Sequence, residues 1–210
     1  MSIFTSIGKF NPGWKFTIFT AIILPILLSL SFWQYQRGLE KSKLESFINN
    51  QQSNPPTEFI SLEYASPSHW YIPFFMQGKF SQKTILVDNA IHEGVRGFSV
   101  YQEFLSNKGL SLLVSKGWSK SFDESKKTLD QNYLLQGVFR PIEKAFTLDN
   151  SIYEREESGL EMQSFDIDSI NLKWNTSYPA VVFELEEFSL DGFTRIWQPV
   201  YLSANRHFGY

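Results

Sequence analysis

The sequence predicts a mainly β protein with flanking helices (α+β), in which one N-terminal transmembrane helix carries one antiparallel barrel- or sandwich-like domain outside the membrane. Three observations predict this class. Positions 16–36 form an uncharged, largely apolar run of membrane-spanning length. Aromatic residues make up 17% of the chain, which favours strands around an aromatic core over a helical bundle. From Trp70 onward, short segments with a period of two alternate with turn signals, as in antiparallel β domains.

The composition narrows the classes of function. The net charge is −3 and the isoelectric point is about 5.7, so we expect no nucleic-acid partner, because such proteins usually present a basic face. The chain has no cysteine. Disulfides, thiolate metal sites and cysteine nucleophiles are therefore excluded.

The predicted first elements are a short tail, residues 1–15, and a transmembrane helix, residues 16–36. Lys15 and Arg37 bound the uncharged run, which as a helix would span roughly 30 Å, the thickness of the hydrocarbon core of a bilayer. Pro25 lies in its middle, where a membrane helix tolerates proline better than a soluble helix does. We interpret the run as a retained membrane anchor, so the lipid membrane is an expected partner.

Two other interpretations of this run stay open. A helix buried in a soluble core is disfavoured, because so long an uncharged run is rare there. A cleaved signal peptide is the second alternative, because Ser29 and Ser31 loosely imitate a small-x-small cleavage site. The run is, however, longer than a usual signal core of roughly 7–15 residues. Basic residues flank the run on both sides, so charge does not fix the membrane orientation.

Beyond the span, we expect the helix to continue to about residue 50, because a helix-forming sequence follows and Asn54-Pro55-Pro56 then ends it. A β-rich extramembrane domain is predicted over 57–203. Glycine-containing turns are expected at His92–Gly97 and Ser106–Gly109. The predicted strands occupy residues 70–80, 84–90, 98–105, 110–118, 133–140, 180–185 and 194–201.

The acidic segment 149–170 is interpreted as a solvated loop that leads into a short helix capped by Asp166 or Asp168. A cation site is the alternative. Its carboxylates lack the regular alternate-position spacing of a calcium loop, so we expect no metal there.

Catalytic motifs are absent from the sequence. The three histidines, His69, His92 and His207, are scattered, and no GxSxG, HExxH, Walker or GxGxxG pattern occurs. We therefore expect a protein that is not an enzyme and has no catalytic residue. An unrecognised periplasmic enzyme stays as an alternative, which a deep polar pocket gathering Asp88, Arg96 or His92 would favour.

Several glycines and tryptophans are expected to serve the fold. Trp70 and Trp118 are interpreted as core or bilayer-edge aromatics. The glycines at turns or bulges, where a positive φ or a close backbone approach is needed, are Gly94, Gly97, Gly109 and Gly117.

Short motifs follow one another along the chain, among them WQYQR after the apolar run and VSKGW in a predicted strand. Their residues are Trp33, Gln34, Arg37, Gly78, Asp88, Asn89, Gly94, Gly97, Gly117, Trp118, Gly137, Arg140, Pro141, Asn205, His207 and Tyr210. The order of these motifs resembles the surfeit locus protein 1 family, in which an arginine is usual at the position of Lys116. The resemblance extends from about residue 15 to the last residue.

The resemblance implies a membrane-anchored assembly factor for haem–copper cytochrome c oxidase. Its implied partners are the catalytic subunit of the oxidase and other oxidase assembly factors, and its implied location is a bacterial inner membrane with the β domain on the outer, periplasmic side. A membrane-anchored scaffold domain for another envelope complex is the alternative. The resemblance also implies that residues 204–210 begin a second transmembrane helix, which is missing from this sequence because it is either a fragment or a naturally shortened form. A soluble domain that ends in a strand is the alternative.

The cofactor implied by the resemblance is haem a, bound transiently. His207 is the implied ligand, because neutral imidazole is a common axial ligand of haem iron. The alternative is an interfacial histidine that binds no metal. Arg37 is expected to anchor the helix at the membrane surface, or alternatively to contact an anionic group such as a haem propionate or a lipid phosphate.

Overall fold

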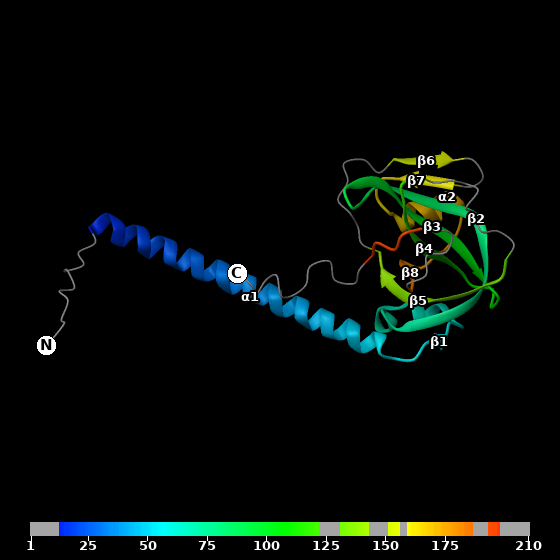
Figure 1. Ribbon diagram of the computed structural model, residues 1–210, viewed down its shortest axis with the longest axis horizontal. Helices are drawn as coiled ribbons and strands as arrows, with labels where there is room; N and C mark the ends of the chain where they lie inside the picture. Colours follow the sequence, from blue (N-terminus) through cyan, green and yellow to red (C-terminus); the bar gives the residue numbers. More distant parts are fainter. Residues whose placement is uncertain (1–12, 122–130, 143–150, 156–158, 187–192, 198–210) are drawn as a thin grey trace. The chain divides into compact units, whose positions relative to one another are not determined.

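A computed structural model describes residues 13–121, 131–142, 151–155, 159–186 and 193–197 of the chain (Figure 1). The chain divides into two compact units, which are described separately. One unit contains the helix up to Phe47, and the other is the β domain, which begins at Ile48. The mainly β class with a long N-terminal apolar helix is confirmed.

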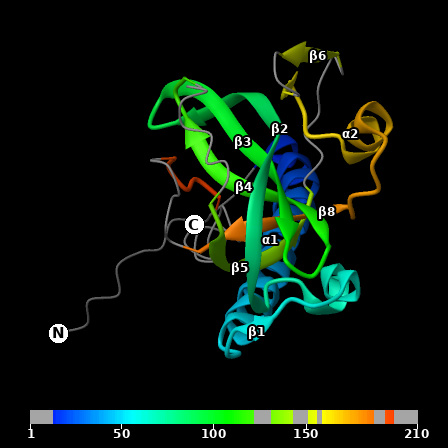
Figure 2. The same cartoon turned by 90° about the vertical axis from the view of Figure 1, so that its right-hand side faces the viewer.

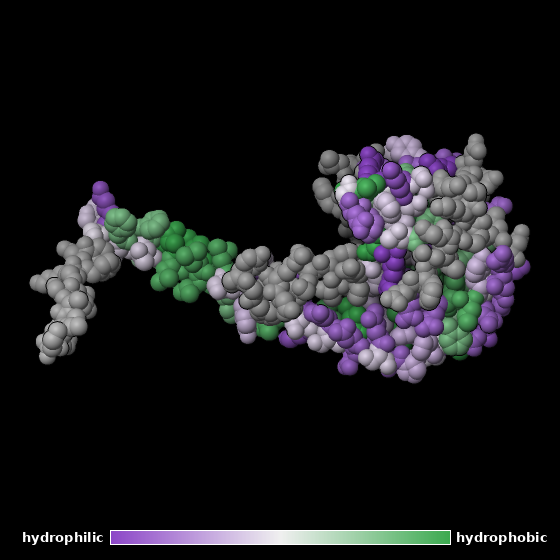
Figure 3. Space-filling view, in the orientation of Figure 1, coloured by the Kyte–Doolittle hydropathy of each residue, from purple (hydrophilic) through white to green (hydrophobic). Residues whose placement is uncertain are grey.

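Helix α1, Trp14–Gln52, runs for 39 residues with Pro25 inside it. In the described part of the chain it is the one helix long and apolar enough to cross a membrane. Figure 3 shows its hydrophobic side chains gathered around the middle of the helix. Phe19, Leu28 and Phe32 are each more than 60% exposed, which argues against a helix buried in a soluble core.

Five strands of the β domain close into a barrel (Figure 2). Around the barrel, β2 pairs with β3, β3 with β4, β4 with β8, β8 with β5, and β5 with β2 again. All these pairs are antiparallel except β4 with β8. The strands are β2 (Pro73–His92), β3 (Val95–Ser106), β4 (Ser111–Ser119), β5 (Tyr133–Pro141) and β8 (Val181–Leu185).

The two predicted hairpins form as glycine turns. The β2–β3 hairpin closes on Glu93 and Gly94, which have φ of 49° and 78°, as a two-residue turn with two positive φ angles requires. Gly109, with φ of 78°, supplies the left-handed residue between β3 and β4, and its N–H donates to Ser106 O (2.9 Å).

Shorter elements surround the barrel. Strand β7 pairs in parallel with residues 84–87 of β2, and β6 pairs with the outer side of β7. These elements are β1 (Thr57–Glu58), the 3₁₀ helices η1 (Leu62–Ala65) and η2 (Pro67–His69), β6 (Ile152–Arg155), β7 (Gly159–Met162) and α2 (Ile167–Trp174).

Three sequence expectations need correction. Residues 152–155 and 159–162 form strands, not a solvated loop, because Leu160 and Met162 are buried against the barrel. The strands predicted at 70–80 and 84–90 are one strand, β2, with a register shift after Phe80. In the predicted strand 194–201, Thr194 makes only an isolated bridge to Trp118, and 198–201 lie outside the described residues.

The two larger apolar clusters of the described residues hold the domain together. The barrel interior is filled mainly by aromatic side chains, among them Phe59, Phe104, Phe139 and Phe183, each no more than 1% exposed. The second cluster lies between the barrel and the covering elements β7 and α2, where Ile170 of α2 is fully buried. The predicted helix cap is confirmed, since the Asp166 side chain accepts from the N–H of Asp168.

Candidate functional site

The motif residues on α1 lie on an exposed helix surface. Trp33 is 55% exposed, and Arg37 Nη1 lies 3.3 Å from Glu40 Oε2, one helical turn further on. Exposed pairs of this kind contribute only about 0.3–0.5 kcal/mol. The guanidinium of Arg37 therefore stays available at the end of the apolar run.

The motif residues of the β2–β3 hairpin pack around one indole ring. Trp118 Nε1 donates to Ala90 O (2.9 Å), and the His92 ring lies 5.3 Å from the Trp118 ring. Gly97 lies directly under the indole, because a Cβ there would come within 2.7 Å of ring atoms. The glycine–tryptophan pattern is thus a packing requirement of the hairpin.

Asp88 and Asn89 lie in the irregular part of β2, where its register with β3 shifts between Val87 and Ala90. Asp88 forms an ion pair with Arg96, whose side chain is 66% exposed. The Asp88 side chain is only 17% exposed, and the His92 ring packs against Trp118 instead of joining this ion pair.

The remaining motif glycines allow close backbone contacts inside the domain. Gly117 has φ of 111°, and a Cβ there would lie 2.6 Å from Thr194 O. At Gly78 and Gly137 a Cβ would come within 2.1 Å of Leu105 O and Glu184 O. Each glycine lets a neighbouring segment approach the barrel where no side chain fits.

Arg140 of β5 forms a buried ion pair with Glu184 of β8, with Nε 2.9 Å from Oε2. Both side chains are less than 10% exposed. Burial raises the pKa of the Glu184 carboxyl, and the charge of Arg140 and a hydrogen bond from Ser115 offset this only partly. Pro141 ends β5 and follows this arginine, so the Gly137–Arg140–Pro141 motif marks the strand that carries the pair.

A short segment after β8 covers this ion pair with an aromatic ring. The guanidinium carbon of Arg140 lies 5.1 Å from the centre of the Trp197 ring, and Tyr71 stacks on the same ring at 6.3 Å. Arg195 approaches that ring at 5.9 Å. Among the described residues, the buried atoms Arg195 Nε and Trp197 Nε1 have no hydrogen-bond partner, and Trp70 Nε1 among the barrel aromatics is a further such donor.

A second buried carboxylate, Glu103 of β3, ties the region after α2 to the barrel. It accepts hydrogen bonds from Ser81 (2.6 Å), Ser111 (2.7 Å) and Tyr178 (2.5 Å), and Lys83 Nζ lies 3.7 Å away. Desolvation raises its pKa, but these hydrogen bonds and the lysine charge outweigh that effect, so the pKa of Glu103 is lowered. The same contact and burial raise the pKa of Tyr178.

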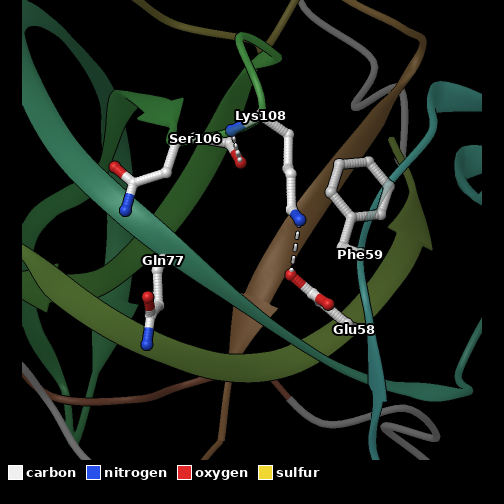
Figure 4. Close-up of a pocket in the computed structure, with 6 residues that line it drawn as sticks. Glu58, Phe59, Gln77, Ser106 and Lys108 are labelled. Atoms are coloured by element: carbon white, nitrogen blue, oxygen red, sulfur yellow. Dashed lines mark hydrogen bonds and ion pairs between the residues drawn. The ribbon is translucent and has the colours of Figure 1, made fainter.

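A small pocket of about 200 Å³ opens beside β1 and the β3–β4 turn. Figure 4 shows Lys108 reaching across it to Glu58, with Nζ 3.2 Å from Oε1, and Phe59 beside them. The charged groups of this pocket, Lys108 and Glu58, form an ion pair with each other at the surface. The pocket therefore has the character of a surface hollow and offers no converging acid, base or nucleophile.

The acidic segment uses its described carboxylates in structural contacts. Glu161 pairs with Arg155 (2.7 Å), Glu154 pairs with Lys173 (2.6 Å), and Asp166 caps α2. Among the described residues, no group of three or more candidate ligands could hold a metal ion.

The structure brings together the hairpin motif around Trp118, whereas Arg140 belongs to a separate buried site. Asn205, His207 and Tyr210 lie outside the described residues. Sequence reasoning missed Glu184, Glu103 and Trp197. A charged residue inside an otherwise apolar strand, as in AVVFEL, was the available signal for Glu184.

Comparison with known proteins identifies the family. The sequence model of the SURF1 family matches residues 21–210, which include most of the apolar run and the whole β domain. A search among curated proteins finds no match to the chain. Because the family match covers most of the chain and agrees with the motif order, the chain belongs to the SURF1 family.

Proposed function

We propose that the chain is a membrane-anchored assembly factor that aids insertion of haem a into cytochrome c oxidase, or maturation of its catalytic subunit. The family match carries this proposal, because SURF1 proteins are known generally as cytochrome oxidase assembly factors. The proposed partners are the catalytic subunit and other oxidase assembly factors. The proposed location is a bacterial inner membrane, with the β domain on the outer side.

The filled barrel supports a role in assembly over catalysis. Aromatic side chains occupy the interior, and the buried charges of Arg140, Glu184 and Glu103 are engaged in ion pairs or hydrogen bonds within the domain. The exposed apolar surface of α1 supports its role as an anchor, since such side chains are stable in lipid.

The haem ligand proposed for this function is His207. Haem a combines a long apolar tail with a polar edge, so it suits a site at the membrane surface, and a neutral imidazole can ligate its iron. Arg37, exposed at the end of the apolar run, is proposed to contact an anionic group there.

The function is tested with the reduced-minus-oxidised visible spectrum of membranes from a strain that lacks the gene. We expect the a-type haem band to fall and the intact gene to restore it. An unchanged band would oppose a role in oxidase biogenesis and would favour a scaffold for another complex.

The ligand is tested separately by purifying the full-length gene product with His207→Ala. We expect less haem a to co-purify than with the wild type. His69→Ala and His92→Ala are matched controls, because those histidines contact Tyr64 and Trp118 within the β domain. Equal haem content in all three variants would remove His207 as the ligand while leaving the assembly role intact.

A further inference from the structure

Two buried hydrogen-bond donors on neighbouring side chains of the β domain have no partner among the described residues. They are Arg195 Nε and Trp197 Nε1, and the Arg195 guanidinium carbon is 5.9 Å from the centre of the Trp197 ring. The Trp197 side chain is 93% buried, being only 7% exposed. A buried donor without an acceptor is unfavourable, so two such donors on neighbouring side chains favour the binding of an acceptor there.

The charges around these donors favour an acceptor that is an anion. Arg140 and Arg195 are both positive, and within the part of the chain that the structure describes Glu184 is the carboxylate that interacts with both. Glu184 already accepts from Arg140 Nε (2.9 Å). The group therefore has one positive charge in excess, on a half-buried arginine that retains access to solvent.

The donors are held in place before any ligand arrives. Thr194, next to Arg195, exchanges two backbone hydrogen bonds with Trp118, at 2.6 and 2.9 Å. The Trp197 ring lies between Arg140, at 5.1 Å, and Tyr71, which stacks almost parallel to it at an angle of 6°. Tyr71 is itself anchored by its N–H to Phe139 O (2.9 Å).

We propose that Arg195 and Trp197, supported by Arg140, form a binding site for a single carboxylate group. A carboxylate has two oxygens and one charge, which match two adjacent N–H donors and one excess positive charge. A phosphate dianion would carry more charge than the group can neutralise and would be repelled by Glu184. The carboxylate comes from an acidic side chain of a protein segment or from a small organic acid. The inference does not depend on haem binding.

The test uses nuclear magnetic resonance of the full chain in detergent, observing the indole N–H signals. Trp197→Phe assigns the Trp197 signal. Sodium acetate, acetyl-Ala-Glu-Ala-amide and inorganic phosphate are titrated separately, at constant ionic strength. We expect the Trp197 signal to move in a saturable way with acetate, because its N–H gains an acceptor.

Two variants control the titration. Arg195→Gln should weaken acetate binding about tenfold or more, since it removes the charge that attracts the anion. Arg96→Gln removes an arginine that pairs with Asp88 on the surface, and it should leave acetate binding unchanged. The Trp118 N–H, which already donates to Ala90 O, serves as the internal reference.

Each outcome of the titrations either supports or overturns the proposed carboxylate site. Saturation with both acetate and the glutamyl peptide supports a site for an acidic protein segment, and saturation with acetate alone supports a site for a small organic acid. Saturation with phosphate but not acetate would overturn the assignment to a carboxylate. A Trp197 signal that moves no more than that of Trp118, or that responds equally in Arg195→Gln, would overturn the site itself.

Discussion

At the scale of single residues, the domain depends on a few positions where only one side chain satisfies both packing and backbone. Gly117 combines φ of 111° with a contact in which an added Cβ would meet Thr194 O at 2.6 Å. Gly109 has φ of 78°, but no atom lies near its missing Cβ. A side chain at Gly109 would therefore introduce backbone strain alone, whereas a side chain at Gly117 would introduce backbone strain and a steric clash.

We predict that Gly117→Ala destabilises the domain by about 3 kcal/mol, whereas Gly109→Ala costs only about 1 kcal/mol. Thermal unfolding of the detergent-solubilised chain, followed by tryptophan fluorescence, measures both. Equal effects of the two substitutions would contradict the steric contribution of Thr194 at Gly117.

The ionisation of Glu103 should make the stability of the folded domain depend on pH. Its folded pKa is lowered, so its carboxylate stabilises the fold above the unfolded pKa of about 4.3, and this stabilisation is lost as the pH falls through the folded value. Glu103→Gln should cost about 2 kcal/mol at pH 7, and its stability should change less between pH 7 and pH 3 than that of the wild type.

Unfolding curves across that pH range measure the Glu103 effect. Glu154→Gln is the control, because its pair with the exposed Lys173 is on the surface and should contribute less than about 0.5 kcal/mol. A wild type whose stability does not decline more steeply than that of Glu103→Gln would oppose the assignment.

At the scale of elements, the side chain of Asn171 connects α2 to the residues that follow it through hydrogen bonds. The Asn171 amide donates to Tyr178 O (3.1 Å), and its carbonyl accepts from Thr176 Oγ1 (3.1 Å) and Tyr178 N–H (2.8 Å). Asn175 then ends the helix in the left-handed conformation, with φ of 50°. This local network positions Tyr178 to reach Glu103.

We predict that Asn171→Ala lowers stability by about 2 kcal/mol, since it leaves the buried Tyr178 backbone without partners. Hydrogen exchange should accelerate most across 167–178. Leu172→Ala, on the same helix but 86% exposed, should have almost no effect. Uniform exchange changes over the whole domain would show that Asn171 does not act locally.

Some elements of the fold could be predicted from the sequence, and others could not. The Asp166 cap, the Glu93-Gly94 turn and the end of α1 before Pro55 follow from local chemistry, so the sequence predicted them. Strands β6 and β7 were missed, because each has only four residues, β7 is stabilised by pairing with a distant part of β2, and β6 pairs only with β7.

At the scale of the whole molecule, a hydrophobic helix and a β domain occur in one cysteine-free chain. Single introduced cysteines can therefore report on membrane topology. With Leu172→Cys, we predict labelling by a membrane-impermeant maleimide in intact spheroplasts, because the position is exposed and the domain is proposed to lie outside. Ser6→Cys, before the helix, should react only after lysis.

The reverse labelling pattern would place the β domain in the cytoplasm and would oppose the proposed location. Reaction of both cysteines in intact spheroplasts would oppose a membrane-spanning α1.

The candidate sites were less predictable than the fold. Motif glycines and Trp118 could be chosen from sequence, because their roles are local to one hairpin. The groups around Glu184 and Trp197 come from segments that the barrel brings together, since Tyr71 precedes β2 and Arg195 follows β8. The spacing of residues within one segment could not reveal that these distant segments lie together in the fold.

The position of β8 has a consequence for how the protein is made. This strand lies between β4 and β5, yet it is the last of the barrel strands along the chain. Until Val181–Leu185 has been synthesised, β4 and β5 each expose a row of unpaired peptide groups, which invites pairing with other chains. Closure of the barrel must therefore wait until nearly the entire domain has been synthesised, and during this delay the open edges of β4 and β5 favour aggregation.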